Sequence, residues 1–156
     1  MSRQVESVGP VAATPTSYDS TMPSENLPEA SRAMHANDDV AHELGIEIIS
    51  SEPGRAEVSV TVTAAMTNGL DVCHGGIIFT VADTAMAHAS NAAGGRTLST
   101  TASIEWLRAV AIGERMVAAR SVTATRGRNS VHDITVRVGD EVGAVVRGQT
   151  LTLSTS

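Results

Sequence analysis

A long pattern of mostly apolar residues, followed along the chain only by strand patterns, constrains the fold of this sequence most. Between His74 and Ala93, apolar residues recur at intervals of three and four, which predicts a helix with a wide apolar face. Gly94 and Gly95 follow it and end it. The apolar positions are Ile77, Ile78, Val81, Ala82, Ala85, Met86 and Ala89. Because so apolar a helix must be covered, we expect it at the centre of the fold.

Strand patterns fill most of the remaining chain. Two early runs alternate apolar and polar residues on either side of Pro53-Gly54, which is typical of a hairpin. Four further strands follow the long helix. Consecutive strands favour an antiparallel sheet, and one apolar helix can cover one of its faces. The sequence therefore predicts an α+β fold. The expected strands are 45–50, 55–63, 97–109, 114–125, 129–138 and 141–153.

Residues 1–30 form a segment rich in Pro, Ser, Thr and Glu that shows no sustained period. We expect a flexible leader there, because such a composition buries too little apolar surface to offset its ordering entropy. Residues 31–156 are then one domain, beginning with a helix over 31–43. The first residues lack the apolar stretch of a secretory signal, and Cys73 is the only cysteine. A cytoplasmic protein without disulfides or membrane spans is expected.

Charge is unevenly distributed along the chain. Of the formal net charge of −6, the first 44 residues carry −5, and the chain contains no lysine. No basic stripe is present, so no nucleic-acid partner is expected. Arginines scattered through the second half could instead pair with an anionic ligand, because a guanidinium group suits phosphate.

Three features near the long helix carry chemistry. The helix starts at His74-Gly75-Gly76, where unpaired backbone N–H groups could form an oxyanion hole and glycine would allow a substrate carbonyl to approach. Close packing of the helix on the sheet explains the glycines equally well. Asp83 lies among apolar residues and could act as a nucleophile or general base, or could simply pair with an arginine. Asn68 could bind a carbonyl, or could only form a turn with Gly69.

The spacing within this helix has a consequence for assembly. Gly75 and Asp83 are eight residues apart, which corresponds to about 12 Å along a helix axis. One substrate carbonyl cannot reach both on the same helix. If both act on it, they come from two antiparallel copies of the helix, and the site requires at least a dimer.

Metal and thiol chemistry are weaker candidates. Cys73, His74, Asp83 and His88 do not match a standard metal-ligand spacing, so no metal is expected. Cys73 and His74 are adjacent, and adjacent side chains rarely point at each other. We interpret Cys73 as a small buried residue.

The run MTNGLDVCHGGIIFTVADTAMAHASN resembles the signature of hotdog-fold acyl-CoA thioesterases, in particular the thioesterases of phenylacetic acid degradation. The resemblance extends from about Leu44, through SIEWLR at 103–108, to Gly148. Proline often follows the arginine of the Leu-Arg pair in that family, whereas Ala109 follows it here. The resemblance implies an antiparallel sheet wrapped around one long helix, and dimers that pair into tetramers. It also implies hydrolysis of phenylacetyl-CoA or its hydroxylated relatives without a cofactor, coenzyme A being part of the substrate.

The same resemblance implies roles for individual residues. Asp83 attacks the thioester or activates water, and the Gly75 N–H of the other chain polarises the carbonyl. Asn68 and His74 occupy supporting positions beside the acyl group.

Other side chains complete the predicted site. Alternation along the strand after the helix places Ser99, Thr101 and Ser103 on one face, and any of them could orient the attacking water. Four arginines are candidates for the coenzyme A phosphates. They are Arg108, Arg126, Arg128 and Arg147.

Two alternatives to a thioesterase stay open at this point. A hotdog hydratase or dehydratase would use His74 with Asp83 to move a proton and water across a double bond. A non-catalytic acyl-CoA binding module would bind the ester without releasing thiol.

Overall fold

The computed structural model describes residues 27–154, which form three helices, a short 3-10 turn and six strands. In chain order these are α1 (Glu29–Ala36), α2 (Asp39–Leu44), β1 (Glu47–Glu52), β2 (Arg55–Thr61), η1 (Ala64–Met66), α3 (Gly75–Asn91), β3 (Thr97–Trp106), β4 (Arg115–Arg126), β5 (Asn129–Val138) and β6 (Glu141–Thr152). None of the described helices is long and apolar enough to cross a membrane.

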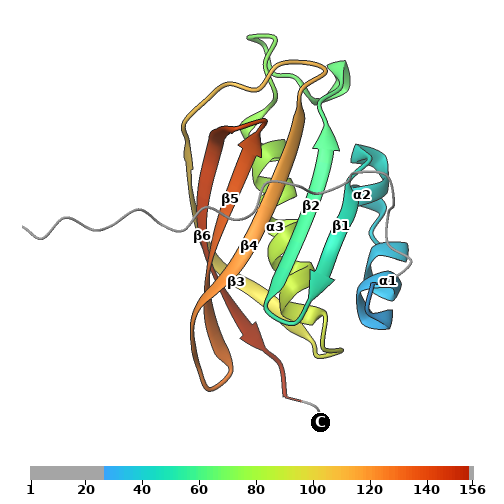
Figure 1. Cartoon of the computed structure of the whole chain (residues 1–156), viewed down its shortest axis with the longest axis vertical. Coiled ribbons are helices and arrows are strands. Elements are labelled where there is room, and N and C mark those ends of the chain that lie inside the picture. The colour runs from blue at the N-terminus through green and yellow to red at the C-terminus, as the bar shows by residue number, and fades with distance from the viewer. Residues whose placement is uncertain (1–26, 155–156) are drawn as a thin grey trace, which may run out of the picture.

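The six strands form one antiparallel sheet in the order β1-β2-β4-β5-β6-β3. The helix α3 runs along one face of this sheet, and α1 and α2 lie beyond the β1 edge (Figure 1). The predicted arrangement of an antiparallel sheet around one long helix is confirmed. At the opposite edge, β3 has no neighbour beyond β6 within residues 27–154.

The apolar face of α3 makes the core, as its periodicity predicts. Val81, Ala82, Ala85 and Met86 are fully buried against the sheet. Small residues on the sheet provide the necessary space: a Cβ added to Gly148 would lie 2.4 Å from Met86 Sδ. Burial of this face is the main driving force that holds α3 on the sheet.

The N-terminal helix differs from the prediction. In place of one helix over 31–43, α1 and α2 are separated at Asn37 and Asp38. The Asp38 side chain accepts a hydrogen bond from Ala41 N at 2.9 Å and caps the second helix, so it competes with continuation of the first. Leu27, within the expected leader, is buried at 6% exposure. The helix α1 already begins at Glu29, so the leader ends earlier than the expected residue 30. Residues 1–26 of it lie outside the described residues.

A bulge in β3 changes which side chains face the helix. Ser99 pairs with Thr150, but Thr101 pairs with Gln149, so Thr100 is an extra residue between them. Opposed residues in an antiparallel pair share a face. Thr150 is buried and Gln149 is exposed, so Ser99 faces α3 while Thr101 faces outward.

Candidate active site

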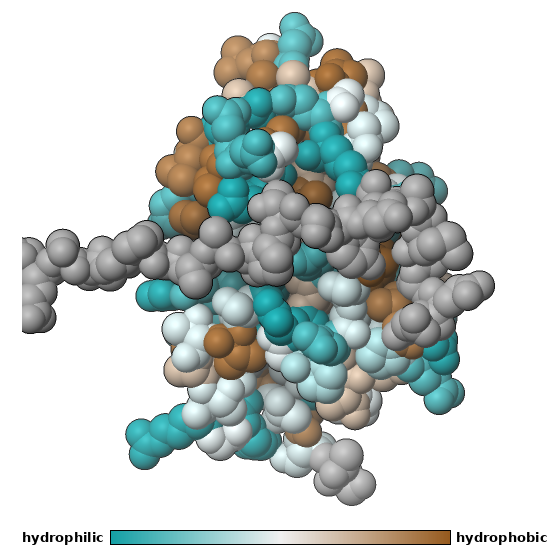
Figure 2. Space-filling model, viewed as in Figure 1, coloured by the Kyte–Doolittle hydropathy of each residue, from teal (hydrophilic) through white to brown (hydrophobic). Residues whose placement is uncertain are grey.

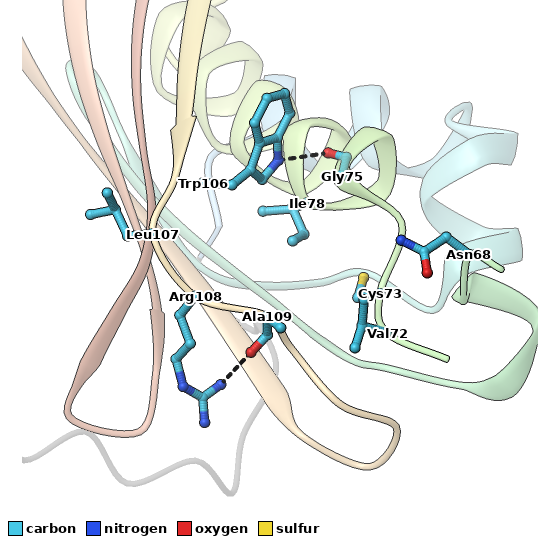
Figure 3. A pocket seen from close by; sticks show the side chains of 9 residues that line it. All are labelled: Asn68, Val72, Cys73, Gly75, Ile78, Trp106, Leu107, Arg108 and Ala109. Carbon is cyan, nitrogen blue, oxygen red and sulfur yellow. Dashed lines mark hydrogen bonds between the residues drawn. The ribbon is translucent and has the colours of Figure 1, made fainter. Parts of the chain in front are cut away.

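The first peptide group of α3 is held from both sides. His74 caps the helix, and its Nδ1 accepts a hydrogen bond from Gly76 N at 2.9 Å. Trp106, the last residue of β3, donates from Nε1 to Gly75 O at 3.2 Å (Figure 3). Both bonds act on the same peptide unit, which joins Gly75 to Gly76. The start of α3 is therefore fixed by one side chain from the helix cap and one from the sheet.

A side chain at either glycine would crowd these rings. A Cβ on Gly75 would lie 3.0 Å from Trp106 Nε1, and a Cβ on Gly76 would lie 3.1 Å from His74 Nδ1. On the side where a Cβ would lie, the indole ring occupies the space at Gly75 and the imidazole ring occupies it at Gly76. The approach of a substrate carbonyl to the backbone N–H side stays a prediction. The alternative explanation for the glycines was close packing of the helix on the sheet. Gly75 shows such packing, because it lies against Trp106 of β3.

The Gly75 N–H remains available for a ligand. No acceptor within residues 27–154 bonds to it. The backbone N–H groups that follow it do have acceptors: that of Gly76 bonds to His74 Nδ1, and those of Ile77 and Ile78 bond to His74 O. The first N–H groups of a helix point outward along its axis and carry partial positive charge. The arrangement can thus stabilise negative charge developing on an oxygen atom.

The cap also restricts what His74 can do. A ring nitrogen that accepts a hydrogen bond carries no proton, so the neutral imidazole has its proton on Nε2. Nδ1 is then unavailable as a base while the cap persists. Nε2 is left as a donor on an exposed side chain at the start of α3.

A pocket of about 320 Å³ opens beside the start of α3. In Figure 3, Trp106 and Ile78 lie on one side of it and Asn68 on the other, while Leu107 points away from the helix. The Asn68 side-chain oxygen accepts from Leu70 N at 2.8 Å, which leaves the amide NH₂ group directed elsewhere as a donor. The lining residues are Asn68, Val72, Cys73, Gly75, Ile78, Trp106, Leu107, Arg108 and Ala109.

The surroundings of this pocket are apolar. Leu70, Leu107 and Ile112 are exposed large apolar residues in the loops at this end of the molecule. Figure 2 shows apolar side chains gathered at the same end, drawn at the top. The pocket wall also contains the Cys73 thiol, whose pKa is raised by burial. Cys73 therefore remains a neutral thiol near pH 7, which does not suit a nucleophile.

Asp83 lies elsewhere on α3, next to the strand β3. Its Oδ1 accepts a hydrogen bond from Ser99 Oγ at 2.9 Å, and the carboxylate is half-buried. Because of the bulge, Ser99 is the one predicted strand hydroxyl brought to the carboxylate. Thr101 and Ser103 lie on the outer face opposite Gln149 and Arg147, so the predicted common face is wrong. Alternation cannot reveal an inserted residue.

The carboxylate and the pocket are separate within one chain. Asp83 does not line the pocket that contains Gly75. Both lie on α3, eight residues apart, which is about 12 Å along the axis.

The four candidate arginines differ in their partners. Arg108 bonds to Glu114 at 2.6 Å and to Glu141 at 2.7 Å, and these contacts raise its pKa. The same hydrogen bond from Arg108 lowers the pKa of Glu114 to about 2. Arg108 is therefore already neutralised by two carboxylates.

The remaining arginines lie further from the pocket. Arg147 pairs with Asp133 at 2.8 Å, and the pKa of Asp133 is lowered mainly by this hydrogen bond. Arg128 donates to Ser154 Oγ at 2.7 Å. Within the described part of the chain, Arg126 has no ion-pair partner, so Arg126 and Arg128 are the two candidates with unneutralised charge.

Sequence reasoning missed Trp106. It appeared only as part of the 103–108 motif, yet it bonds to Gly75 and forms a wall of the pocket. A signal was present in the composition, because it is the only tryptophan in a chain with 2% aromatic residues.

Comparison with known proteins identifies clear relatives. Residues 70–145 match the family model described as the Thioesterase superfamily. The acyl-coenzyme A thioesterase PaaI of Escherichia coli is 41% identical over 104 residues, covering 67% of this chain and 74% of the relative.

Solved structures agree with the sequence match. The E. coli PaaI protein from the phenylacetic acid degradation operon has a TM-score of 0.78 and 36% identity, covering 81% of this chain and 93% of the other. A single-residue mutant of the phenylacetic acid degradation protein PaaI from Thermus thermophilus has a TM-score of 0.72 and 25% identity, covering 74% of this chain and all of the other.

Proposed function

This chain belongs to the thioesterase superfamily as an acyl-CoA thioesterase similar to PaaI, and from that premise we propose that its substrate is an aryl-acetyl-CoA. The products are the free aryl-acetic acid and coenzyme A. The apolar pocket bounded by an indole ring supports an aromatic acyl group. The E. coli relative of similar structure comes from the phenylacetic acid degradation operon, which supports the same substrate class.

The separation of Gly75 from Asp83 on α3 carries the second part of the proposal, which is an active site shared between two chains. A free N–H beside a pocket can hold the developing oxyanion, and a carboxylate can activate water, but about 12 Å divides them in one chain. Two chains with antiparallel α3 helices place the Gly75 of one chain opposite the partner's Asp83.

The open edge of β3 offers the surface for such a dimer. Trp106 contacts Gly75 near one end of β3, and Ser99 contacts Asp83 near the other. A two-fold axis through the middle of β3 would therefore place the Gly75–Trp106 pair of each chain at the position of the Asp83–Ser99 pair of the other chain. It would bring the Gly75–Trp106 unit of each chain beside the partner's carboxylate. Unpaired edge strands favour this kind of antiparallel addition.

The proposed reaction uses protein groups alone, with no resident cofactor. Ser99 Oγ–H donates to Asp83 Oδ1, so Oδ2 and the Ser99 lone pairs can hold a water molecule. Asp83 takes a proton as the water oxygen attacks the carbonyl carbon, and the charge on the carbonyl oxygen is stabilised by the Gly75 N–H of the partner subunit. The C–S bond then breaks, and the coenzyme A thiolate takes up the proton. His74 Nε2 and the Asn68 amide are donors available to the acyl end.

The hydratase alternative finds less support in this geometry. It requires His74 as a base, whereas Nδ1 of that residue is engaged in capping α3.

The better candidates for binding the coenzyme A phosphates are Arg126 and Arg128. Neither has a carboxylate partner among residues 27–154, whereas Arg108 and Arg147 do.

Thiol release from a series of aryl and alkyl CoA esters tests the activity and its specificity. We expect the highest kcat/KM with phenylacetyl-CoA or a hydroxylated relative. Asp83→Asn should lower kcat by about 10²-fold to 10⁴-fold, the usual contribution of a general base. Asp140→Asn, at an exposed turn, is the matched control and should keep wild-type activity. Near-full activity of Asp83→Asn would contradict the assignment.

Isotope labelling separates the two roles left open for Asp83. In a single turnover in H₂¹⁸O, general-base catalysis places ¹⁸O in the product acid. Nucleophilic attack by the carboxylate would instead form a mixed anhydride on Asp83, which hydroxylamine can trap. This anhydride places ¹⁸O in Asp83 when water attacks the aspartyl carbonyl.

Mixing inactive variants tests the shared site. Gly75→Pro removes the N–H, and His74 already has the extended conformation (ψ 132°) that precedes proline well. The proline ring would also press on Trp106 of the same chain, so the variant impairs only the half-site that this chain contributes with Gly75. Each variant alone should be inactive. A mixture of Gly75→Pro and Asp83→Asn chains, unfolded and refolded together, should recover about a quarter of wild-type activity, because hybrid dimers contain one intact site. No recovery, or full activity in a species shown to be monomeric by ultracentrifugation, contradicts the dimer.

A further inference from the structure

Trp106 uses only one edge of its ring in contacts within the chain. Its Nε1 donates to Gly75 O, and its ring lies against the Cα of Gly75. The side chain is nevertheless 53% exposed, an unusual amount for so large an apolar group. The exposed part borders the pocket, with Ile78 below it and Asn68 across from it (Figure 3).

The contact edge of the ring acts on the proposed oxyanion site indirectly. Trp106 holds the carbonyl of the Gly75–Gly76 peptide, while His74 holds the N–H of the same peptide. With this unit fixed at both atoms, the preceding peptide, which bears the free Gly75 N–H, has little freedom to rotate. A donor fixed before the reaction needs no reorganisation as charge develops.

The exposed face of the ring is suited to a different task. Aromatic groups pack favourably on an indole face in offset or edge-to-face arrangements. Trp106 is about half exposed, and the lining nearby is aliphatic or small, as with Ile78 and Cys73. In the proposed dimer the ring also lies beside the Ser99 of the partner subunit, next to the reacting carbonyl.

We propose that Trp106 is a positioning and specificity-determining residue: its indole N–H orients the Gly75 N–H, and its ring face selects aromatic acyl groups. This inference rests on the proposed thioesterase function and names the residue that sets its substrate class. Gly75 and Trp106 form a matched pair, since a Cβ at position 75 would lie only 3.0 Å from the indole Nε1 and crowd the ring.

Two substitutions separate the two roles. Trp106→Phe keeps an aromatic face but loses the N–H donor, and Trp106→Leu loses both. Ile112→Ala, which removes an equally exposed apolar side chain outside the pocket, is the control. Circular dichroism and thermal melting establish that each variant is folded.

We expect Trp106→Phe to lower kcat about twofold to tenfold, the effect of one hydrogen bond, while KM for phenylacetyl-CoA and the preference for aryl over alkyl esters persist. Trp106→Leu should show the same loss of kcat and a further twofold to tenfold fall in the aryl-to-alkyl ratio of kcat/KM. Ile112→Ala should match the wild type. An active wild type whose Trp106 variants keep both kcat and this ratio overturns the inference. A wild type that releases no thiol from any ester instead overturns the proposed function.

Fluorescence gives a direct readout that a merely structural role would not produce. Because Trp106 is the only tryptophan, emission reports on this ring alone. Titrating the Asp83→Asn protein with phenylacetyl-CoA should shift the emission to the blue as the exposed ring is covered, and acetyl-CoA should give a smaller shift. Unchanged emission under conditions where calorimetry shows phenylacetyl-CoA bound contradicts contact with the ring.

Discussion

Replacing Arg120 with methionine should stabilise the folded protein. Arg120 lies on the inner face of β4 at 4% exposure and has no carboxylate partner within residues 27–154. One of its nitrogens donates to the buried His132, whose Nε2 bonds to Thr150 Oγ1 at 2.7 Å. Its Nε and Nη1 have no hydrogen-bond partner. A lone buried cation of this kind lowers stability.

The size of the effect follows from the pKa of the guanidinium group. Burial lowers this pKa from its ordinary value to about 10. At 1.36 kcal/mol per pKa unit, the charged form costs the folded state about 3 kcal/mol. Methionine fills a similar length without charge, but His132 loses a partner. We therefore expect a net gain of about 1–3 kcal/mol in the free energy of unfolding.

Urea unfolding at pH 7 measures this gain, with the exposed Arg96→Met as control, which should change stability by less than about 0.5 kcal/mol. Because the pKa is lower in the folded state, the penalty is fully present below about pH 10 and declines between pH 10 and 12.5. The difference between wild type and Arg120→Met should narrow over that range. A variant less stable than the wild type by more than about 1 kcal/mol at pH 7 would show that the charge is compensated, and would refute the reasoning.

Three further outcomes are expected. Ser99→Ala should lower kcat about tenfold or more by removing a charge-assisted hydrogen bond to the carboxylate of Asp83, the proposed general base, whereas Thr101→Ala on the outer face should retain activity in a thiol-release assay. Burial lowers the pKa of His88 to about 4, so stability in urea should fall as the pH drops from 6.5 towards 4, and a stable His88→Leu variant should show a smaller fall. Gly148→Ala should lower the melting temperature, since its Cβ would lie 2.4 Å from the fully buried Met86 sulfur and overpack the core by about 1–3 kcal/mol.

Most of the fold could be read from periodicity. The helix expected over 74–93 is observed at Gly75–Asn91, and the strand expected over 129–138 has the same bounds in the structure. These segments combine a sustained pattern with glycine at their ends. The N-terminal helix was less predictable, because the side-chain cap at Asp38 outweighs a pattern that looks continuous.

The candidate site was predicted less completely. Gly75 and Asp83 belong to one sequence motif, and their spacing of eight residues predicts a site built from two chains if both act on one carbonyl. The partners of these residues depend on contacts between segments far apart in the chain. Trp106 reaches Gly75 across 31 positions, and Ser99 reaches Asp83 across 16.

The sequence by itself determined the helix, the strands and the residue types at the chemical centre, because those follow from local periodicity and from groups placed next to one another in the chain. Only the tertiary structure decided what surrounds them. The bulge at Thr100 selects Ser99 over Thr101, and the end of β3 places an indole against Gly75. Register and packing decide both, since an inserted residue changes the facing of a strand without altering its composition.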